Sequence, residues 1–391
     1  MHRGPSGTYL KQPSGSDAFQ AFCPASLPPD PPLVFSPKRR KLLERATLAL
    51  GRLDSITLLL PDPDIFLYAY VRREAILSSQ IEGTQSSLSD LFLFEVEEFS
   101  ADSLDDITEV SNYVKALNYG ITRMADGFPL SNRLLREMHA ILLADGRGSD
   151  KQPGQFRTSQ NWIGGTRPGT AHYVPPPPYL VEESMSNLEK FLHDETQPYQ
   201  TLIKAGIAHV QFETIHPFLD GNGRLGRMLI AFILHHEGQL KHPLLYLSLY
   251  FKQHRERYYE LLDIVRHEGD WEAWIDFFLT GVEVTAGNAV ETARNLVNIF
   301  RDDGKSLQHL GARSGSVLRV YQAFCQRPIN SIGGAKDFTD LSYPAVAAAV
   351  ESLVTLGILK EITGRKRNRL YMYSDYIKAL ETGIGETEAQ E

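Results

Sequence analysis

Apolar residues recur every three or four positions over most of this chain, which is the pattern of amphipathic α-helices. One such helix is predicted from Pro37, because five apolar side chains then fall near one face: Leu42, Leu43, Ala46, Leu50 and Leu53. A second helix is expected to begin at Asp62 or Asp64, where Asp-Pro-Asp supplies an N-cap and a proline for the first turn. Gly83 is its expected end.

Further helices are predicted along the chain, and strand signals are few. The helical ranges are 103–126, 131–144, 180–193, 201–215, 226–237, 249–266, 270–279 and 281–301. Residues 157–174 instead have the pattern of a β-hairpin, with a Gly/Thr/Pro turn before four prolines at 175–178. We therefore predict a mainly α-helical body that carries one small β-hairpin flap.

The segment 314–380 differs from the body and predicts a winged helix-turn-helix domain. It contains helical stretches at 316–325, 333–338 and 342–356, followed by a hairpin pattern that ends near 373. The predicted wing is basic, with Lys360, Arg365, Lys366, Arg367 and Arg369. The helix that would read bases has one charged residue, Glu351, and no Lys, Arg, Asn or Gln. We therefore do not expect DNA binding, and packing against the body, a second subunit or a target protein fits this helix better.

Composition and charge exclude some classes of protein but do not indicate which reaction the protein catalyses. The 391 residues carry a net charge of −8, which argues against a chain that coats nucleic acid or anionic membrane. Apolar runs fall far short of the ~20 residues of a membrane helix, and the N-terminus lacks the apolar core of a signal peptide. Only two cysteines are present, far apart in the sequence, so a cytoplasmic location is expected.

One stretch stands apart from the helical pattern, HPFLDGNGRLGR at 216–227, between two apolar helical segments. Its three glycines let backbone N–H groups converge on an anion, and the next helix adds the positive end of its dipole. Arg224 and Arg227 can each hold a phosphate group, and Asp220 is a hard oxygen ligand for Mg²⁺. His216 can accept a proton near neutral pH. This combination indicates a nucleotidyl or phosphoryl transfer site.

Three alternative roles for this loop fit its residues less well. Residues 221–226 also match GxGxxG, but no β-strand precedes them, so a dinucleotide-binding fold is set aside. The loop contains no GxxxxGK[ST], which excludes a P-loop ATPase. A loop that only turns a corner would need the glycines, but not His, Asp and two Arg together.

The run HPFLDGNGRLGR resembles the signature of the Fic family, HPFx[DE]GNGRxxR, at every specified position. The resemblance implies a helical Fic-type bundle that transfers AMP from ATP to a protein hydroxyl. His216 would then deprotonate the hydroxyl, Asp220 would hold Mg²⁺, and Phe218 would anchor the loop. The ATP-binding positions implied within the motif are Gly221, Asn222, Gly223, Arg224, Leu225, Gly226 and Arg227. The anion hole would use N–H groups and the side chain of residues 221–223.

The resemblance extends to two further regions of the chain. Residues 154–157, GQFR, and the segment Ile163, Gly164, Gly165 and Thr166 resemble the family's flap, which docks a target segment by β-augmentation. Tyr258 and Tyr259 stand where relatives line the adenine and ribose pocket. Adjacent helix residues point in different directions, so we expect only one of the two to stack on the base.

An upstream motif, SSQIEG at 78–83, fits the family's inhibitory pattern [ST]xxxE[GN]. Its spacing places Ser78 and Glu82 on one helix face just before Gly83. The resemblance implies that Glu82 pairs with Arg227 and takes the position that the γ-phosphate of ATP needs.

These features together predict a protein adenylyltransferase that is autoinhibited by Glu82. It would modify Tyr, Thr or Ser hydroxyls of a target protein, or of itself, and it could act as a homodimer. Removal of AMP from a target at the same site, and a nucleotide-sensing DNA regulator, are the alternatives. The expected division is a Pro-rich extension (1–36), an inhibitory helical region (37–100), a Fic core (101–281), a linker helix (282–313), the winged domain (314–380) and a disordered tail (381–391).

Overall fold

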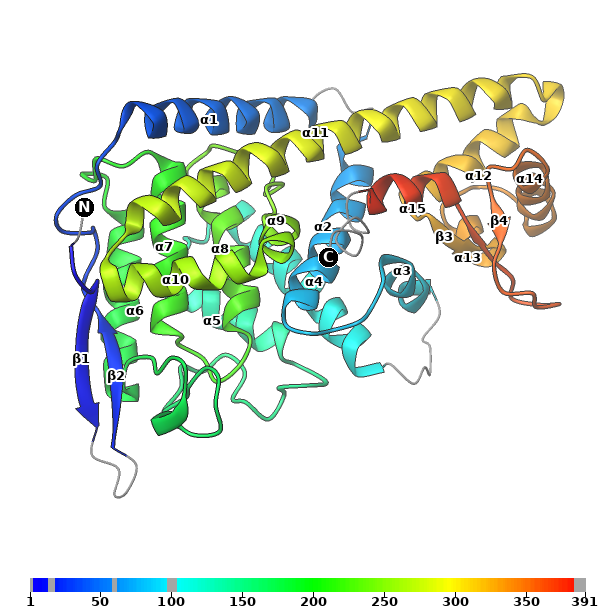
Figure 1. The fold of residues 1–391 in the computed structure, drawn as a ribbon. Helices are drawn as coiled ribbons and strands as arrows, with labels where there is room; N and C mark the ends of the chain where they lie inside the picture. Colours follow the sequence, from blue (N-terminus) through cyan, green and yellow to red (C-terminus); the bar gives the residue numbers. More distant parts are fainter. Residues whose placement is uncertain (1–2, 13–17, 58–61, 97–103, 383–391) are drawn as a thin grey trace.

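The computed structural model describes residues 3–12, 18–57, 62–96 and 104–382 of the chain. Residue 103, the predicted start of one helix, and most of the predicted tail at 381–391 lie outside the described residues. Helices dominate, and a long helix along one side joins the main body to a smaller C-terminal unit (Figure 1). The helices of the body are α1 Pro37–Thr57, α2 Pro63–Ile81, α3 Leu88–Val96, α4 Leu104–Ala125, α5 Asn132–Leu142, α6 Pro178–His193, α7 Thr201–Ile215, α8 Asn222–His236, α9 Ser248–Gln253, α10 Arg255–Glu268 and α11 Trp271–Gln308.

The first two helices form as the sequence pattern predicts. All five apolar side chains assigned to one face of α1 are buried, and this helix lies along α11 (Figure 1). Asp62 is the N-cap of α2, where its side chain accepts a hydrogen bond of 3.0 Å from the backbone N–H of Asp64. Pro63 occupies the first turn, and Gly83 follows the helix with φ +105°, a conformation that favours glycine.

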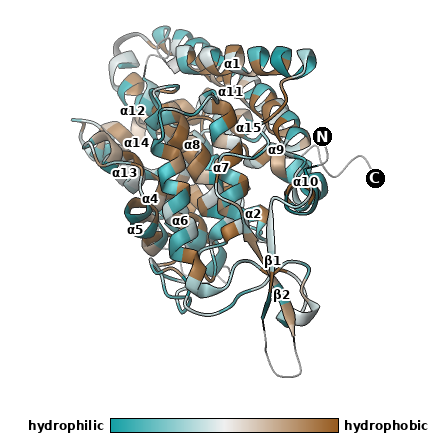
Figure 2. Cartoon of the chain, turned by 90° about the vertical axis from the view of Figure 1, so that its left-hand side faces the viewer, coloured by the Kyte–Doolittle hydropathy of each residue, from teal (hydrophilic) through white to brown (hydrophobic). Residues whose placement is uncertain are grey.

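The helices α7 and α8 form the centre of the body. Nearly every residue of α7 is buried and α8 is buried over most of its length, so both are enclosed by other helices, and hydrophobic stretches concentrate there (Figure 2). Trp274 of α11 donates a 2.9 Å hydrogen bond to the carbonyl of Gly206 in α7. The loop that joins α7 to α8 therefore starts and ends on a rigid support.

Several boundaries differ from the predicted ones. The region 249–266 is interrupted at His254, which separates α9 from α10. The predicted break near residue 280 is wrong, because α11 continues through Gly281, where a Cβ would lie 2.7 Å from the ring of Tyr250. The glycine there serves close packing, and the predicted linker helix 282–313 is largely the second half of α11. Helix α8 begins at Asn222 instead of 226, and α3 was not predicted.

The strands of the body also differ from expectation. The Pro-rich extension forms a hairpin of β1 Gly7–Gln12 and β2 Phe19–Pro24, held to the body by a 2.9 Å hydrogen bond from Phe22 N to Val174 O. The hairpin expected over 157–174 is reduced to a loop with one antiparallel bridge, between Ile163 and Tyr173. Its glycines and prolines leave too few consecutive residues for a longer ladder.

The C-terminal unit contains helices and a three-stranded antiparallel sheet of order β3-β5-β4. Its elements are α12 Ser314–Gln326, β3 Ile329–Ser331, α13 Ile332–Asp337, α14 Tyr343–Thr355, β4 Lys360–Glu361, β5 Leu370–Met372 and α15 Ser374–Glu381. The unit contacts α2 directly, since Tyr376 donates to Ile65 O at 3.2 Å and Arg73 donates to Thr382 O at 2.9 Å. The assignment as a winged helix stays a prediction. Among the described helices, none is long and apolar enough to cross a membrane.

Candidate active site

The α7–α8 loop turns sharply at both of its ends. His216 caps α7 in the left-handed region, with φ 50° and ψ 60°, and Gly221 begins α8 with φ 75°. The side chain of Asn222 closes the loop internally: Oδ1 accepts from Phe218 N and Nδ2 donates to Phe218 O, both at 2.9 Å. Both polar atoms of this side chain are therefore bonded within the loop, and its contribution to an anion hole stays a prediction.

His139 of α5, which the sequence pattern did not indicate, packs against the α7–α8 loop and supports it. Its Nδ1 accepts a hydrogen bond from Gly154 N at 2.8 Å, so Nε2 carries the proton and donates to Asp220 O at 3.0 Å. The imidazole stacks on Phe218 with ring centres 3.7 Å apart, and burial lowers its pKa to about 4. A lone histidine on a helix gives no sequence signal for such a role.

The imidazole of His216 is held neutral. Burial, followed by the positive charges of Arg157 and Arg266, lowers its pKa to about 3. Its Nδ1 is buried while the residue as a whole is partly exposed, so Nε2 is the ring nitrogen that a proton donor from outside can reach. A neutral histidine with this orientation is suited to act as a general base.

Arg224 and Asp220 belong to a cluster of charges at the start of α8. Arg224 is 2 % exposed and forms an ion pair of 2.7 Å with Glu109 of α4 and a longer one of 3.4 Å with Asp220. Burial raises the pKa of Glu109, and Arg224 counteracts that shift. Glu109 was not identified from the sequence, since it lies about a hundred residues before the motif.

The motif predicted to be inhibitory, at 78–83, and the second arginine of the loop, Arg227, are in direct contact. Arg227 donates from Nε to Ser78 Oγ at 2.8 Å and from Nη2 to Glu82 Oε1 at 2.7 Å. Burial alone would raise the pKa of Glu82, but Arg227 lowers it below its ordinary value, so Glu82 is ionised at neutral pH. A Cβ at Gly223 would collide with Glu82 Oε1, so the absence of a side chain there lets the carboxylate reach the loop. The carboxylate thus occupies space beside the N-terminus of α8.

The two adjacent tyrosines of α10 have different environments. Tyr258 is 1 % exposed, and its hydroxyl meets His209 Nε2 at 2.9 Å. His209 Nδ1 contacts the carbonyl of Gly226, which can only accept, so Tyr258 is the donor to Nε2. Tyr259 is 38 % exposed. Tyr258 is therefore part of the core, and of the two tyrosines only Tyr259 is exposed.

The flap residues lie on the surface near the loop. Trp162 and Ile163 are 39 % and 36 % exposed, and Asn161 donates to Phe218 O at 2.9 Å, which joins the flap to the loop. Gly164 and Gly165 have φ of 70° and 71°, so a residue with a side chain would be strained at either position. Thr166 follows in the exposed turn.

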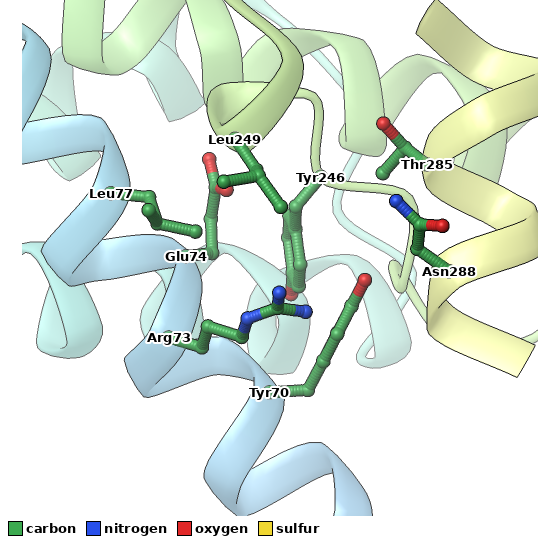
Figure 3. A pocket seen from close by; sticks show the side chains of 8 residues that line it. All are labelled: Tyr70, Arg73, Glu74, Leu77, Tyr246, Leu249, Thr285 and Asn288. Atoms are coloured by element: carbon green, nitrogen blue, oxygen red, sulfur yellow. The ribbon is translucent and has the colours of Figure 1, made fainter. Parts of the chain in front are cut away.

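A buried carboxylate lies one helical turn before Ser78, on the inner side of α2. Glu74 lines a small pocket between α2 and α11 with Arg73 and Tyr246 (Figure 3). Its Oε1 accepts from Tyr113 at 3.2 Å and from Ser248, whereas Oε2 has no partner among the described residues. Burial raises the pKa of Glu74 to about 7.

The raised pKa of Glu74 predicts that the free energy of unfolding falls as pH rises. The Glu74→Gln variant should show less of this pH dependence. The folded chain holds a proton on Glu74 that the unfolded chain releases near its ordinary pKa, so this contribution is full below that pKa and is lost as pH rises through about 7. At pH 8 the variant should gain up to about 3 kcal/mol relative to the unaltered chain, and little at pH 4.5. Urea unfolding at both pH values measures the difference. An equal difference at both would show that Glu74 does not titrate in this range.

Two protein-family models match this chain. Residues 40–122 match the Fic/DOC family N-terminal model, and residues 129–234 match the Fic/DOC family model. The chain therefore carries a Fic/DOC N-terminal domain and a Fic/DOC domain.

Curated relatives and solved structures give the same family. Protein adenylyltransferase Fic of Drosophila persimilis is 26 % identical over 233 residues, which are 56 % of this chain and 43 % of the relative. The enzyme of that name in Culex quinquefasciatus is 30 % identical over 187 residues, 48 % of this chain and 34 % of the relative. The chain thus matches less than half the length of these relatives.

The fold is that of Fic proteins. A Fic family protein of Desulfovibrio desulfuricans superimposes with a TM-score of 0.57 at 20 % identity, over 88 % of this chain and 98 % of that structure. Fic-1 of C. elegans superimposes with a TM-score of 0.52 at 22 % identity, over 65 % and 72 %.

Proposed function

We propose that this chain is a protein adenylyltransferase that transfers AMP from ATP to a hydroxyl group of a protein. The observation that carries the proposal is the α7–α8 loop, where a neutral His216 stands at one end and two buried arginines begin the helix at the other. The curated relatives that share 26–30 % identity bear the name of this activity. The nucleobase is assigned as adenine by this resemblance, because the loop itself would contact only the phosphates.

His216 would act as the general base in the transfer. Nε2 takes the proton of a Tyr, Thr or Ser hydroxyl as its oxygen bonds to the α-phosphorus of ATP. The bond from that phosphorus to the bridging oxygen breaks, and pyrophosphate leaves with the electron pair. The first-turn N–H groups at residues 221–223, with Arg224 and Arg227, would stabilise the negative charge of the phosphates. Leu225 and Gly226 hold α8 against the core.

The residues at the start of α8 fit a magnesium ion that arrives with the nucleotide. Asp220 presents carboxylate oxygens beside the N-terminus of α8, and no group of three ligating side chains exists among the described residues. Mg²⁺ in nucleotide sites is commonly held by one or two carboxylates together with phosphate oxygens and waters, so one carboxylate suffices. When bound, the ion would neutralise phosphate charge, and Asp220 would hold it.

Glu82 would keep this activity low. Its carboxylate binds Arg227, which the γ-phosphate of ATP would otherwise contact, so ATP would bind in a pose unsuited to attack. The target segment would dock on the flap at Ile163, Gly164 and Gly165, with Tyr259 against the adenine. The target could be another protein or a second copy of the chain.

Incubation of the Glu82→Gly variant with ATP and Mg²⁺, followed by intact mass, tests the proposal. We expect one or more added AMP groups and an equal amount of pyrophosphate. Conversion of ATP to ADP and phosphate without added mass would contradict adenylyl transfer. A gain of phosphate alone would mean that the site catalyses a different phosphoryl transfer.

A further inference from the structure

Arg157 is a charged side chain that lies in the interior without a carboxylate partner of its own. The residue is 1 % exposed, and within the described part of the chain the hydrogen bonds of its guanidinium all end on backbone carbonyls. The acceptors are His216 O at 2.9 Å, Pro176 O at 2.6 Å, Ile215 O at 3.3 Å and Ser159 O at 3.4 Å. Burial lowers the pKa of Arg157 to about 10, so the cation persists at neutral pH.

These four carbonyls belong to two different parts of the protein. Ile215 and His216 end α7, where the last carbonyls have no partner within the helix and carry the negative end of its dipole. Ser159 and Pro176 belong to the two limbs of the flap, on either side of the bridge between Ile163 and Tyr173. One rigid, planar cation therefore fastens both limbs of the flap to the backbone of His216.

We propose that Arg157 is a positioning residue that couples the flap, where the target docks, to the conformation of His216. This rests on the function proposed above. His216 keeps a left-handed conformation that is costly for a residue with a side chain, and the Arg157–His216 hydrogen bond supports it directly. Any displacement of the flap limbs moves Ser159 and Pro176, and through the guanidinium it moves the carbonyl of His216.

The chemistry of the contact requires arginine. Its five N–H donors have a fixed planar arrangement, so several carbonyls can be bound at once. Nη2 alone binds Pro176 O and Ile215 O, while Nε binds His216 O and Nη1 binds Ser159 O. A lysine would keep the charge, but three donors on one nitrogen could not bind all four carbonyls at once. The positive charge also disfavours protonation of His216, after burial itself. The two effects, geometry and charge, can therefore be separated by substitution.

Arg157→Lys and Arg157→Met test the proposal with two readouts that need no catalysis. An NMR titration follows the His216 imidazole, whose signal is assigned by comparison with His216→Ala. In the unaltered chain the imidazole should stay unprotonated down to about pH 5. In Arg157→Met the pH at which half of it is protonated should be higher. The Lys variant should titrate close to the unaltered chain. Hydrogen exchange of backbone amides over 159–176 should be about tenfold faster in both variants. Because neither of these two measurements depends on catalysis, their results stand whether or not AMP transfer is found.

The matched control is Arg136→Met. Arg136 also binds the beginning of the flap, with hydrogen bonds to Gly154 O at 2.9 Å and Gln155 Oε1 at 2.6 Å, and these bonds do not involve His216. The Arg136→Met variant should leave the pH midpoint of the His216 titration unchanged.

In the Glu82→Gly background, Arg157→Lys should lower kcat for self-modification several-fold and leave the KM for ATP unchanged. Unchanged flap exchange together with an unmoved His216 midpoint in Arg157→Met would overturn the proposal. If Arg157→Met does not fold, unchanged flap exchange in Arg157→Lys overturns it equally.

Discussion

The Glu82→Gly variant is expected to attach AMP at least about tenfold faster than the unaltered chain, an effect that corresponds to about 1.4 kcal/mol. The substitution removes the carboxylate that lies 2.7 Å from Arg227 Nη2, and it opens the space next to Gly223. Arg227 keeps its bonds to Ser78, so the guanidinium stays in position for a phosphate. A time course of intact mass with ATP and Mg²⁺ measures the rate.

Two controls distinguish inhibition from a general loosening of the helices. Glu82→Gln keeps the size of the side chain without its charge, so it should give an intermediate rate. Glu95→Gln removes a different carboxylate that binds the same helix, through Arg72 at 2.9 Å, and should leave the rate unchanged. A Glu95 variant as active as Glu82→Gly would mean that any weakening around α2 activates the site and that Glu82 has no specific role.

His216→Ala in the Glu82→Gly background is expected to lower AMP transfer by about 10² to 10⁴-fold, the usual contribution of a general base. The protein should still bind ATP, because on this proposal the phosphates would contact the start of α8 and not the imidazole. The initial rate of AMP incorporation and the affinity for a fluorescent ATP analogue are the two measurements.

The matched control is His236→Ala, which removes an exposed histidine at the opposite end of α8. It should transfer AMP at the rate of its parent. Transfer by His216→Ala at more than about a tenth of the parent rate would show that another group accepts the proton.

The helices and the loop were largely predictable from sequence, because both depend on local residue types. Glycines, a capping aspartate and the apolar periodicity act within a few positions of themselves, so α2, α7 and the turn at His216 follow from short segments. The pairing of Glu82 with Arg227 was expected only through family resemblance, and the structure contains this contact. The hydrogen bond from Arg227 to Ser78 was not predicted.

The supporting residues could not be predicted, since each depends on contacts between distant segments. His139 and Arg157 act through backbone groups, which any sequence supplies, so nothing in the residue pattern indicates them. The distinction between Tyr258 and Tyr259 depends on His209, about fifty residues earlier. The helix break predicted near residue 280 was wrong because a glycine that permits close packing cannot be distinguished in a sequence from a glycine that ends a helix.

Transfer of label from two forms of ATP tests the central claim most directly. The Glu82→Gly protein is incubated with Mg²⁺ and with ATP that carries radioactive phosphorus at either the α or the γ position, beside a Glu82→Gly/His216→Ala protein. Adenylyl transfer predicts that the protein retains the α label, releases the γ label as pyrophosphate, and stays unlabelled when His216 is absent. Retention of the γ label, or equal α labelling without His216, would contradict the account.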